Sequence, residues 1–217
     1  MQNSRKSIVE IGTAYFDLLA KNSKLPAGIQ EAYSAGKKEV VYAEFYSRKK
    51  LAPGLSGIVD FILPADQLLV GVTNLDKGKI PVGVFMACVA IQTNYAFCGN
   101  VAWKDQPSAQ NYSNNEYFNT IHGKVRNSEF SFRNGNRVIV ECLTKSLLSN
   151  SAGGYATEAN EENAFMLPQP KLIAPDKDIK VQFNIAADSL TVSQTAADNH
   201  FIEFLIKGVK LIDRTEG

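Results

Sequence analysis

Short runs in which apolar and polar residues alternate fill much of the chain after Lys37, and this alternation restricts the possible folds more than any other feature. Ile179–Ile185 (IKVQFNI) and residues 201–212 (FIEFLIKGVKLI) show it most clearly. Successive side chains of an extended strand point to opposite faces, so the pattern predicts strands with one buried face. Almost no helical pattern separates these runs, which argues against parallel βαβ units.

Six further runs rich in Val, Ile, Phe and Tyr have the length of strands. They lie at residues 39–46, 57–63, 68–73, 82–92, 128–133 and 137–142. The run at 82–92 is apolar almost throughout, as expected of a strand buried on both faces. Asn134-Gly135 separates the fifth and sixth runs and is the strongest hairpin signal in the chain.

About eight strands at irregular spacing predict a mainly β chain. We expect an antiparallel β-sandwich of jelly-roll-like topology, with residues 37–217 forming the sandwich domain. An immunoglobulin-like sandwich is the competing topology, but it usually needs only about 100 residues. Residues 100–124 and 146–170 resist assignment, and loops of this length often make interfaces. We expect a short helix at 114–122 within the first of them.

The first 36 residues have a different texture and predict a short helical arm. Ser7 is a candidate N-cap with Glu10 three residues on, which is a capping-box pattern. We expect the helix to end near Lys21 or Asn22, before Pro26, and a second short helix at 28–34. The helix carries one apolar stripe, consisting of Ile8, Ile11, Tyr15, Leu18 and Leu19.

That stripe is the candidate assembly interface of the chain. An apolar stripe must be covered, and an isolated helix of about 15 residues is marginal in water. The sandwich can bury its own core, so we expect the arm (residues 1–36) to dock on a neighbouring copy. The alternative is that the arm packs on its own sandwich.

Residues that carry chemistry are sparse. The two histidines, His122 and His200, have no metal-ligand spacing and are expected on the surface or in loops. The three cysteines lack CxxC spacing, and we expect Cys88 and Cys142 to be buried free thiols in a reducing compartment; a disulfide from Cys98 is the alternative. Neither a nucleophile elbow nor a phosphate-binding glycine loop occurs. The sequence predicts no enzyme, no catalytic residue, no metal and no cofactor.

Charge and composition limit the partners. The 217 residues carry a net charge of +1, so a broad basic footprint for nucleic acid is missing. Basic residues gather locally at Lys37-Lys38 and at 48–50, interleaved with Tyr42, Phe45 and Tyr46. Together with Arg5 and Lys6, these residues either contact nucleic acid or a lipid surface, or place their aromatics in a core and their charges in water. The first six residues lack the apolar stretch of a signal peptide, so synthesis in a cytoplasm is expected.

The layout resembles a known family. Leu63-Pro64 ends one run, and Gln67-Leu-Leu-Val-Gly-Val-Thr-Asn-Leu75, Lys79-Ile-Pro81 and the buried run 82–92 follow. Later come Lys171-Leu-Ile173, 178–182 and a closing run that ends in Lys207-Gly-Val-Lys210. Over most of 37–213 this resembles the jelly-roll capsid (coat) proteins of tailless icosahedral bacteriophages. The resemblance implies a structural homo-oligomer of the virion, whose partners are copies of itself and other virion proteins, without a small-molecule substrate.

A different class of function stays open. The chain could instead be a β-sandwich module that binds carbohydrate or another ligand on an exposed aromatic platform. Candidates for that platform are Trp103, Tyr112, Tyr117 and Phe118.

Overall fold

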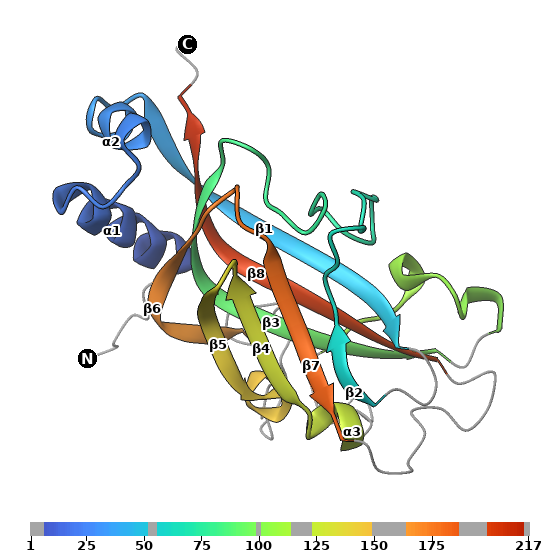
Figure 1. Cartoon of the computed structure of the whole chain (residues 1–217). Helices are drawn as coiled ribbons and strands as arrows, with labels where there is room; N and C mark the ends of the chain where they lie inside the picture. The colour runs from blue at the N-terminus through green and yellow to red at the C-terminus, as the bar shows by residue number, and fades with distance from the viewer. Residues whose placement is uncertain are drawn as a thin grey trace, which may run out of the picture.

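The computed structural model describes residues 7–51, 56–98, 101–113, 123–148, 164–186 and 199–214. The helices are α1 (Ile8–Lys21), α2 (Ala27–Ser34) and α3 (Gly123–Arg126), with 3₁₀ turns η1 (Val101–Trp103), η2 (Pro107–Ala109) and η3 (Thr144–Leu147). The strands are β1 (Lys38–Leu51), β2 (Gly57–Asp60), β3 (Phe85–Cys98), β4 (Glu129–Asn134), β5 (Arg137–Leu143), β6 (Phe165–Ile173), β7 (Ile179–Ile185) and β8 (Asn199–Asp213). Figure 1 shows α1 and α2 at one end of a β-sandwich.

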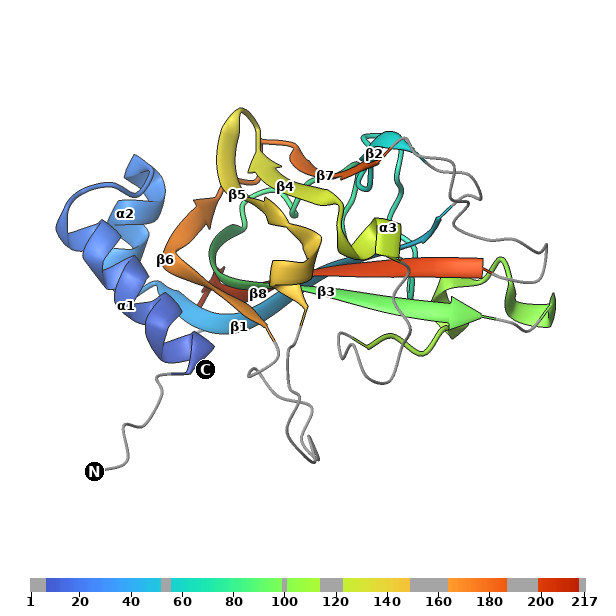
Figure 2. The ribbon, with the colours of Figure 1, turned by 90° about the horizontal axis from the view of Figure 1, so that it is seen from below.

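Two four-stranded sheets form the sandwich, and Figure 2 shows them as two layers. Their strand orders are β1-β8-β3-β6 and β2-β7-β4-β5, with antiparallel pairing throughout. The first strand pairs with the last, the second with the seventh, the third with the sixth and the fourth with the fifth. One long antiparallel ribbon folded over into two sheets gives this pairing, which is the jelly-roll arrangement. The predicted jelly-roll-like sandwich is therefore confirmed.

Aromatic rings fill the space between the sheets. Phe130 of β4 has its ring centroid 5.3 Å from that of Phe183 in β7 and 5.6 Å from that of Phe204 in β8. Along β7 the inward residues Ile179, Val181, Phe183 and Ile185 are buried, and the residues between them face outward, as the alternation predicted. Aromatic pairs at these separations contribute beyond their buried area, so this cluster ties the two layers together.

A β-bulge in β3 shapes the sheet beneath the arm. Cys88 pairs with Gly208 and Ala90 with Lys207, which leaves Val89 as the extra residue. Val89 and Ala90 are both buried and form a small cluster with Ile8 at the start of α1. The bulge thus redirects the strand so that it receives the N-terminal end of the helix.

One strand prediction was wrong, and one strand was missed. Residues 68–73 form a turn and not a strand, because Gly71 has φ +80° and the backbone reverses there. The sequence reasoning also missed β6, which contains Pro168 and Pro170. β6 is an edge strand whose pairing with β3 skips residues 167–170, and prolines are tolerated at such places. The run at 82–92 begins later than predicted and continues through Thr93 and Asn94 to Cys98.

The helical predictions agree closely with the structure. Ser7 caps α1, and its hydroxyl accepts from the backbone N–H of Glu10 while the Glu10 carboxylate accepts from the Ser7 N–H. α1 ends at Lys21, and α2 covers the second expected helix. The helix expected at 114–122 lies outside the described residues.

Candidate functional site

The five stripe residues of α1 do not share one environment. Ile8 and Leu19 are buried, Ile11 and Tyr15 are half-buried, and Leu18 is 55% exposed. Leu19 packs with Ala87, Val209 and Leu211 on the outer face of the β1-β8-β3-β6 sheet. The structure thus places α1 on the sheet of its own chain, which is the alternative and not the expected docking on a neighbouring copy. A role of the arm in assembly stays a prediction.

Sequence reasoning missed the two residues that hold α1 most closely to the sheet. Phe16 is fully buried in the same cluster, and a Cβ atom on Gly12 would lie 2.4 Å from Cγ2 of Val209. Ile8, Gly12, Phe16 and Leu19 follow a helical repeat and form the buried face. A glycine within the helical pattern was the available signal, because small residues let a helix approach a sheet closely.

A groove lies beside the exposed edge of α1, and we call it the α1 groove. It has a volume of about 360 Å³ and is lined by Tyr15, Leu18, Leu19, Asn22, Lys24, Arg137 and Leu172. Its apolar walls come from α1 and from Leu172 of β6, which is the outer strand of the sheet. Three of the five predicted interface residues therefore line one accessible apolar groove.

Arg48 of β1 is the centre of a polar cluster on the outer face of the same sheet. Its Nε donates to Oε1 of the buried Glu203 at 2.6 Å, and its Nη1 donates to the carbonyl oxygen of Gly71 at 2.9 Å. Asn94 donates from Nδ2 to the other carboxylate oxygen of Glu203. The guanidinium carbon lies 5.0 Å from the ring centroid of Tyr46 and 5.3 Å from that of Tyr112. The Arg48 side chain thus holds two segments against the sheet: the turn at 68–73, through Gly71, and the segment that contains Tyr112.

A tight turn next to Arg48 holds apolar side chains out in water. We call it the apolar turn; Leu68, Leu69 and Val70 on it are 58%, 59% and 88% exposed. Reciprocal backbone bonds between Leu69 and Thr73, at 3.1 and 2.9 Å, close the turn. The backbone N–H of Arg48 donates to the Val72 carbonyl oxygen at 2.8 Å, and the Thr73 hydroxyl donates to the Tyr46 carbonyl oxygen at 3.0 Å. The apolar turn is therefore fixed to β1 by several hydrogen bonds.

Four of the five basic residues in the two local clusters, Lys38, Arg48, Lys49 and Lys50, form ion pairs within the chain, and Lys37 is exposed. Lys38 lies 2.6 Å from Asp213, Lys49 lies 2.7 Å from Asp66, and Lys50 lies 2.6 Å from Asp105. Lys50 holds the pKa of the exposed Asp105 below its ordinary value. Of the interleaved aromatics, Phe45 is buried in the core, Tyr46 is half-buried and Tyr42 is exposed. These charges are thus largely compensated by their neighbours.

The predicted aromatic platform is only partly described. Trp103 is 51% exposed, whereas Tyr112 is half-buried and stacks on Arg48. Burial, and then the charge of Glu203, raise the pKa of the Tyr112 hydroxyl, so it stays neutral over the physiological range. Tyr117 and Phe118 lie outside the described residues. Trp103 and Tyr112 therefore do not form a flat pair of exposed rings.

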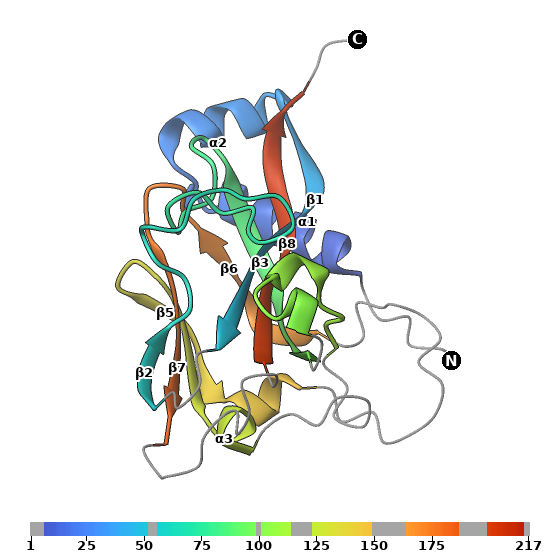
Figure 3. The ribbon, with the colours of Figure 1, turned by 90° about the vertical axis from the view of Figure 1, so that its right-hand side faces the viewer.

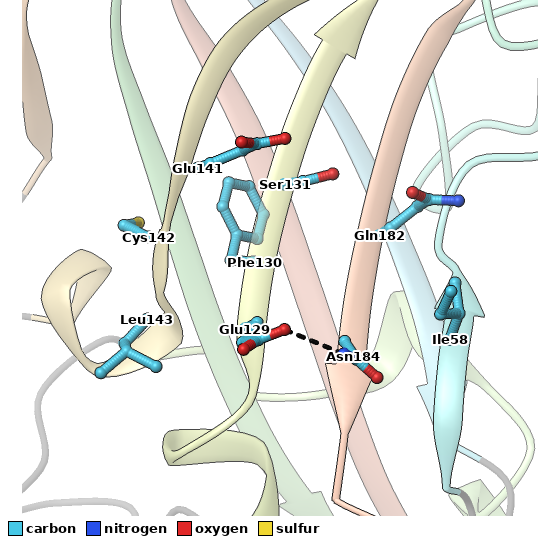
Figure 4. A pocket seen from close by; sticks show the side chains of 9 residues that line it. All are labelled: Ile58, Glu129, Phe130, Ser131, Glu141, Cys142, Leu143, Gln182 and Asn184. Carbon is cyan, nitrogen blue, oxygen red and sulfur yellow. Dashed lines mark hydrogen bonds between the residues drawn. The ribbon is translucent and has the colours of Figure 1, made fainter.

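A polar depression lies on the outer face of the β2-β7-β4-β5 sheet and is shown in Figure 4. Its volume is about 530 Å³, and Ser131, Glu141 and Gln182 lie across its centre. Asn184 donates from Nδ2 to Oε2 of Glu129 at 2.9 Å, as the dashed line marks. Ile58 lies on one side and Leu143 on the other. Amide, hydroxyl and carboxylate groups with apolar flanks can bind a hydroxyl-rich molecule.

The histidine and cysteine predictions have mixed outcomes. His200 lies in β8 and is buried, so its expected surface location was wrong; its Nδ1 shares a hydrogen bond with the Tyr95 hydroxyl. His122 lies outside the described residues. None of Cys88, Cys98 and Cys142 forms a disulfide; the first two are buried and the third is half-buried. Burial raises the pKa of the Cys88 thiol well above its ordinary value.

The described residues show neither a cluster of metal ligands nor a helix that could cross a membrane. They contain no group of three or more His, Cys, Asp or Glu side chains placed to hold a metal ion. Within the same part of the chain, no helix has the length and apolar character needed to cross a bilayer. Comparison with protein-family models, with curated proteins and with solved structures finds no match to this chain.

Proposed function

We propose that the protein is a structural subunit of the capsid of a tailless icosahedral bacteriophage. The observation that carries the proposal is an ordered, exposed apolar turn on a jelly-roll sandwich. Capsid subunits are one of the classes built on jelly rolls, but the fold alone is no argument for a function. Apolar side chains that a folded chain holds out in water mark surfaces for other proteins. In this proposal the partners are copies of the chain and other virion proteins.

The shape of the subunit supports a role in a shell. β1, β3 and β8 contain 14, 14 and 15 residues, and they lie side by side in one sheet. Figure 3 shows from another side that α1 lies across that sheet. Phe16 and Gly12 pack the helix closely against the strands. A braced sheet of this length is a rigid block, which suits a protein whose work is to hold neighbours at fixed angles.

Location and further contacts follow from the proposal. The subunit is made in the host cytoplasm and resides in the virion. Contact of the basic arm with nucleic acid or an internal membrane would use Lys21, Lys24 and Lys37, which are exposed. Lys38, by contrast, is paired with Asp213.

The second candidate is a module that binds carbohydrate. The depression in Figure 4 favours it, because Ser131, Gln182 and Asn184 offer hydrogen-bonding groups between the apolar side chains of Ile58 and Leu143. Sugars are bound by this combination of polar groups and apolar contact.

Light scattering after size-exclusion chromatography, at micromolar concentration, separates the two candidates. A capsid subunit gives discrete oligomers with closed symmetry. A carbohydrate module stays a monomer or dimer, and its melting temperature rises when a bound sugar is added. The capsid proposal would be contradicted if the protein were a monomer at all concentrations, if a sugar raised its melting temperature, and if Gln182→Ala abolished that increase.

A further inference from the structure

We propose that the apolar turn of one copy docks into the α1 groove of the next, so that subunits associate head to tail. This inference rests on the proposed function as a self-assembling subunit and names the surfaces that perform it. Two observations on one chain carry it: a rigid apolar projection and an open apolar groove.

The apolar turn is prepared for binding before any partner arrives. Its backbone is closed by the Leu69–Thr73 bonds and fixed to Tyr46 and Arg48 of β1. A surface that is already ordered loses little conformational freedom on association, which favours affinity. Val70 at its tip is 88% exposed, so its contacts are available to a partner.

The charges around the turn favour a protein partner over a lipid or a nucleic acid. Arg48, Lys49 and Lys50 lie beside the turn, but each is paired, with Glu203, Asp66 and Asp105 respectively. Anionic lipids and phosphate backbones are bound through basic groups whose charge is not already compensated. The turn therefore presents an apolar surface, and the charged residues around it are already paired. Apolar surface with few uncompensated charges is typical of the centre of a protein interface.

The α1 groove has the matching chemistry. Leu18 is 55% exposed on it, and Tyr15 and Leu172 complete the apolar walls, while Asn22, Lys24 and Arg137 give polar groups. An apolar floor with a polar rim is the usual composition of a specific interface. A cavity of roughly 150 Å³ can hold a benzene-sized group, so about 360 Å³ has room for the side chains of Leu69 and Val70.

The placement of the two surfaces makes the contact propagate. The turn is held by β1 at one edge of the β1-β8-β3-β6 sheet, and the groove is lined by Leu172 of β6 at the opposite edge. When the turn of one copy fills the groove of the next, the pair still has one free groove and one free turn at its two ends. Contacts between different surfaces of successive copies close into rings or shells when the rotation allows it.

Two variants of exposed residues and a matched control test the docking. Val70→Lys places a charge at the tip of the apolar turn, and Leu18→Lys places a charge in the wall of the α1 groove. Val82→Lys is the control: it replaces an apolar residue that is 96% exposed and lies outside both surfaces. Lysine suits the last turn of α1 because a cation there complements the helix dipole. All three variants are expected to melt like the wild type, since the side chains they replace are largely in water.

Sedimentation velocity of the full chain gives the result. We expect the wild type and Val82→Lys to form the higher oligomer, and each of the other two variants to associate at least about tenfold more weakly, the factor that burying one aliphatic side chain contributes. Mixed at equal concentrations, Val70→Lys and Leu18→Lys should form a dimer and nothing larger, because the mixture holds one intact turn and one intact groove per pair.

Other results would overturn the inference. If the wild type assembles and both variants assemble equally well, the docking is wrong while the capsid proposal stands. If the wild type does not assemble at all, both fail. If Val70→Lys keeps the oligomer but loses binding to vesicles of anionic lipid, the turn serves a membrane and not a second copy.

Discussion

Gly208 of β8 lies so close to Ala87 of β3 that a Cβ atom built on Gly208 would sit 1.9 Å from the Ala87 carbonyl oxygen. The contact occurs where Gly208 pairs with Cys88, immediately before the bulge at Val89. Glycine inside a strand often marks such a close approach of another backbone. Gly208 therefore allows β8 and β3, the two central strands of the sheet that carries the arm, to lie close together.

Gly208→Ala should therefore be among the most destabilising single changes in the chain. The obstacle is backbone and cannot rotate away, so we expect a loss of about 3 kcal/mol or more in the free energy of unfolding. Gly28→Ala in α2 is the matched control, because a Cβ there has no neighbour within 4 Å and alanine favours a helix. Urea denaturation measures both, and equal stability of the two variants would contradict the register of β3 and β8.

Gly12→Ala tests whether the arm belongs to the fold of its own subunit. In an undocked helix the change would favour helix formation by about 1 kcal/mol. Docked on the sheet, the new methyl meets the buried Val209, so we expect a net loss of about 1–2 kcal/mol. Val209→Ala in the same chain should relieve part of that loss in a double-mutant cycle. A more stable Gly12→Ala protein would mean that α1 does not pack as described.

Arg48→Met should loosen the contacts of the apolar turn and of the Tyr112 segment with the sheet. It retains much of the apolar stem but leaves the carboxylate of Glu203, whose side chain is 5% exposed, without its cation. Breaking a buried pair in this way costs about 3–5 kcal/mol. Adding Glu203→Gln should recover a large part of the loss, because no buried charge then remains. Thermal melts of the three variants check this, and no recovery in the double variant would show that the ion pair is not the reason.

The raised pKa of the buried Cys88 thiol predicts that the folded protein loses stability at alkaline pH. Burial keeps it neutral in the folded protein because its pKa is raised, whereas in the unfolded chain it ionises near pH 8.5. The folded state then binds more protons, so the contribution of this thiol to the free energy of unfolding is constant below about pH 8 and falls above it by up to about 1.4 kcal/mol per pH unit. Cys142 adds a decline of the same sign.

Urea denaturation between pH 7.5 and 10 measures that slope. Cys88→Ala should flatten the decline without abolishing it, and Cys142→Ala is the matched control for the half-buried thiol. Above pH 10 the raised pKa values of Tyr33 and Tyr112 steepen the curve in both variants. An unchanged slope in Cys88→Ala would contradict the burial of this side chain.

Much of the fold was accessible from the sequence because the sandwich repeats local rules. Alternation defined β7 to the residue, and Asn134-Gly135 defined the hairpin between β4 and β5, where Gly135 has φ +59°. The capping box placed the start of α1 for the same reason: Ser7 and Glu10 satisfy each other without help from the rest of the chain.

The failures lie where tertiary context decides. Pro168 and Pro170 disfavour a strand in general, and only the edge position of β6 makes them acceptable. Residues 68–73 are apolar enough for a strand, but Gly71 and the bonds to Tyr46 and Arg48 make them a turn. The pairing of Arg48 with Glu203 joins residues 155 positions apart, which no local pattern encodes. The apolar turn and the α1 groove were invisible for the same reason.

Electron micrographs of the purified full-length protein test assembly most directly. The account predicts closed rings or shells of uniform diameter, with cyclic or icosahedral symmetry, that vanish in Val70→Lys and persist in Val82→Lys. Particles no larger than a single jelly-roll subunit, in wild-type protein at micromolar concentration, would contradict it.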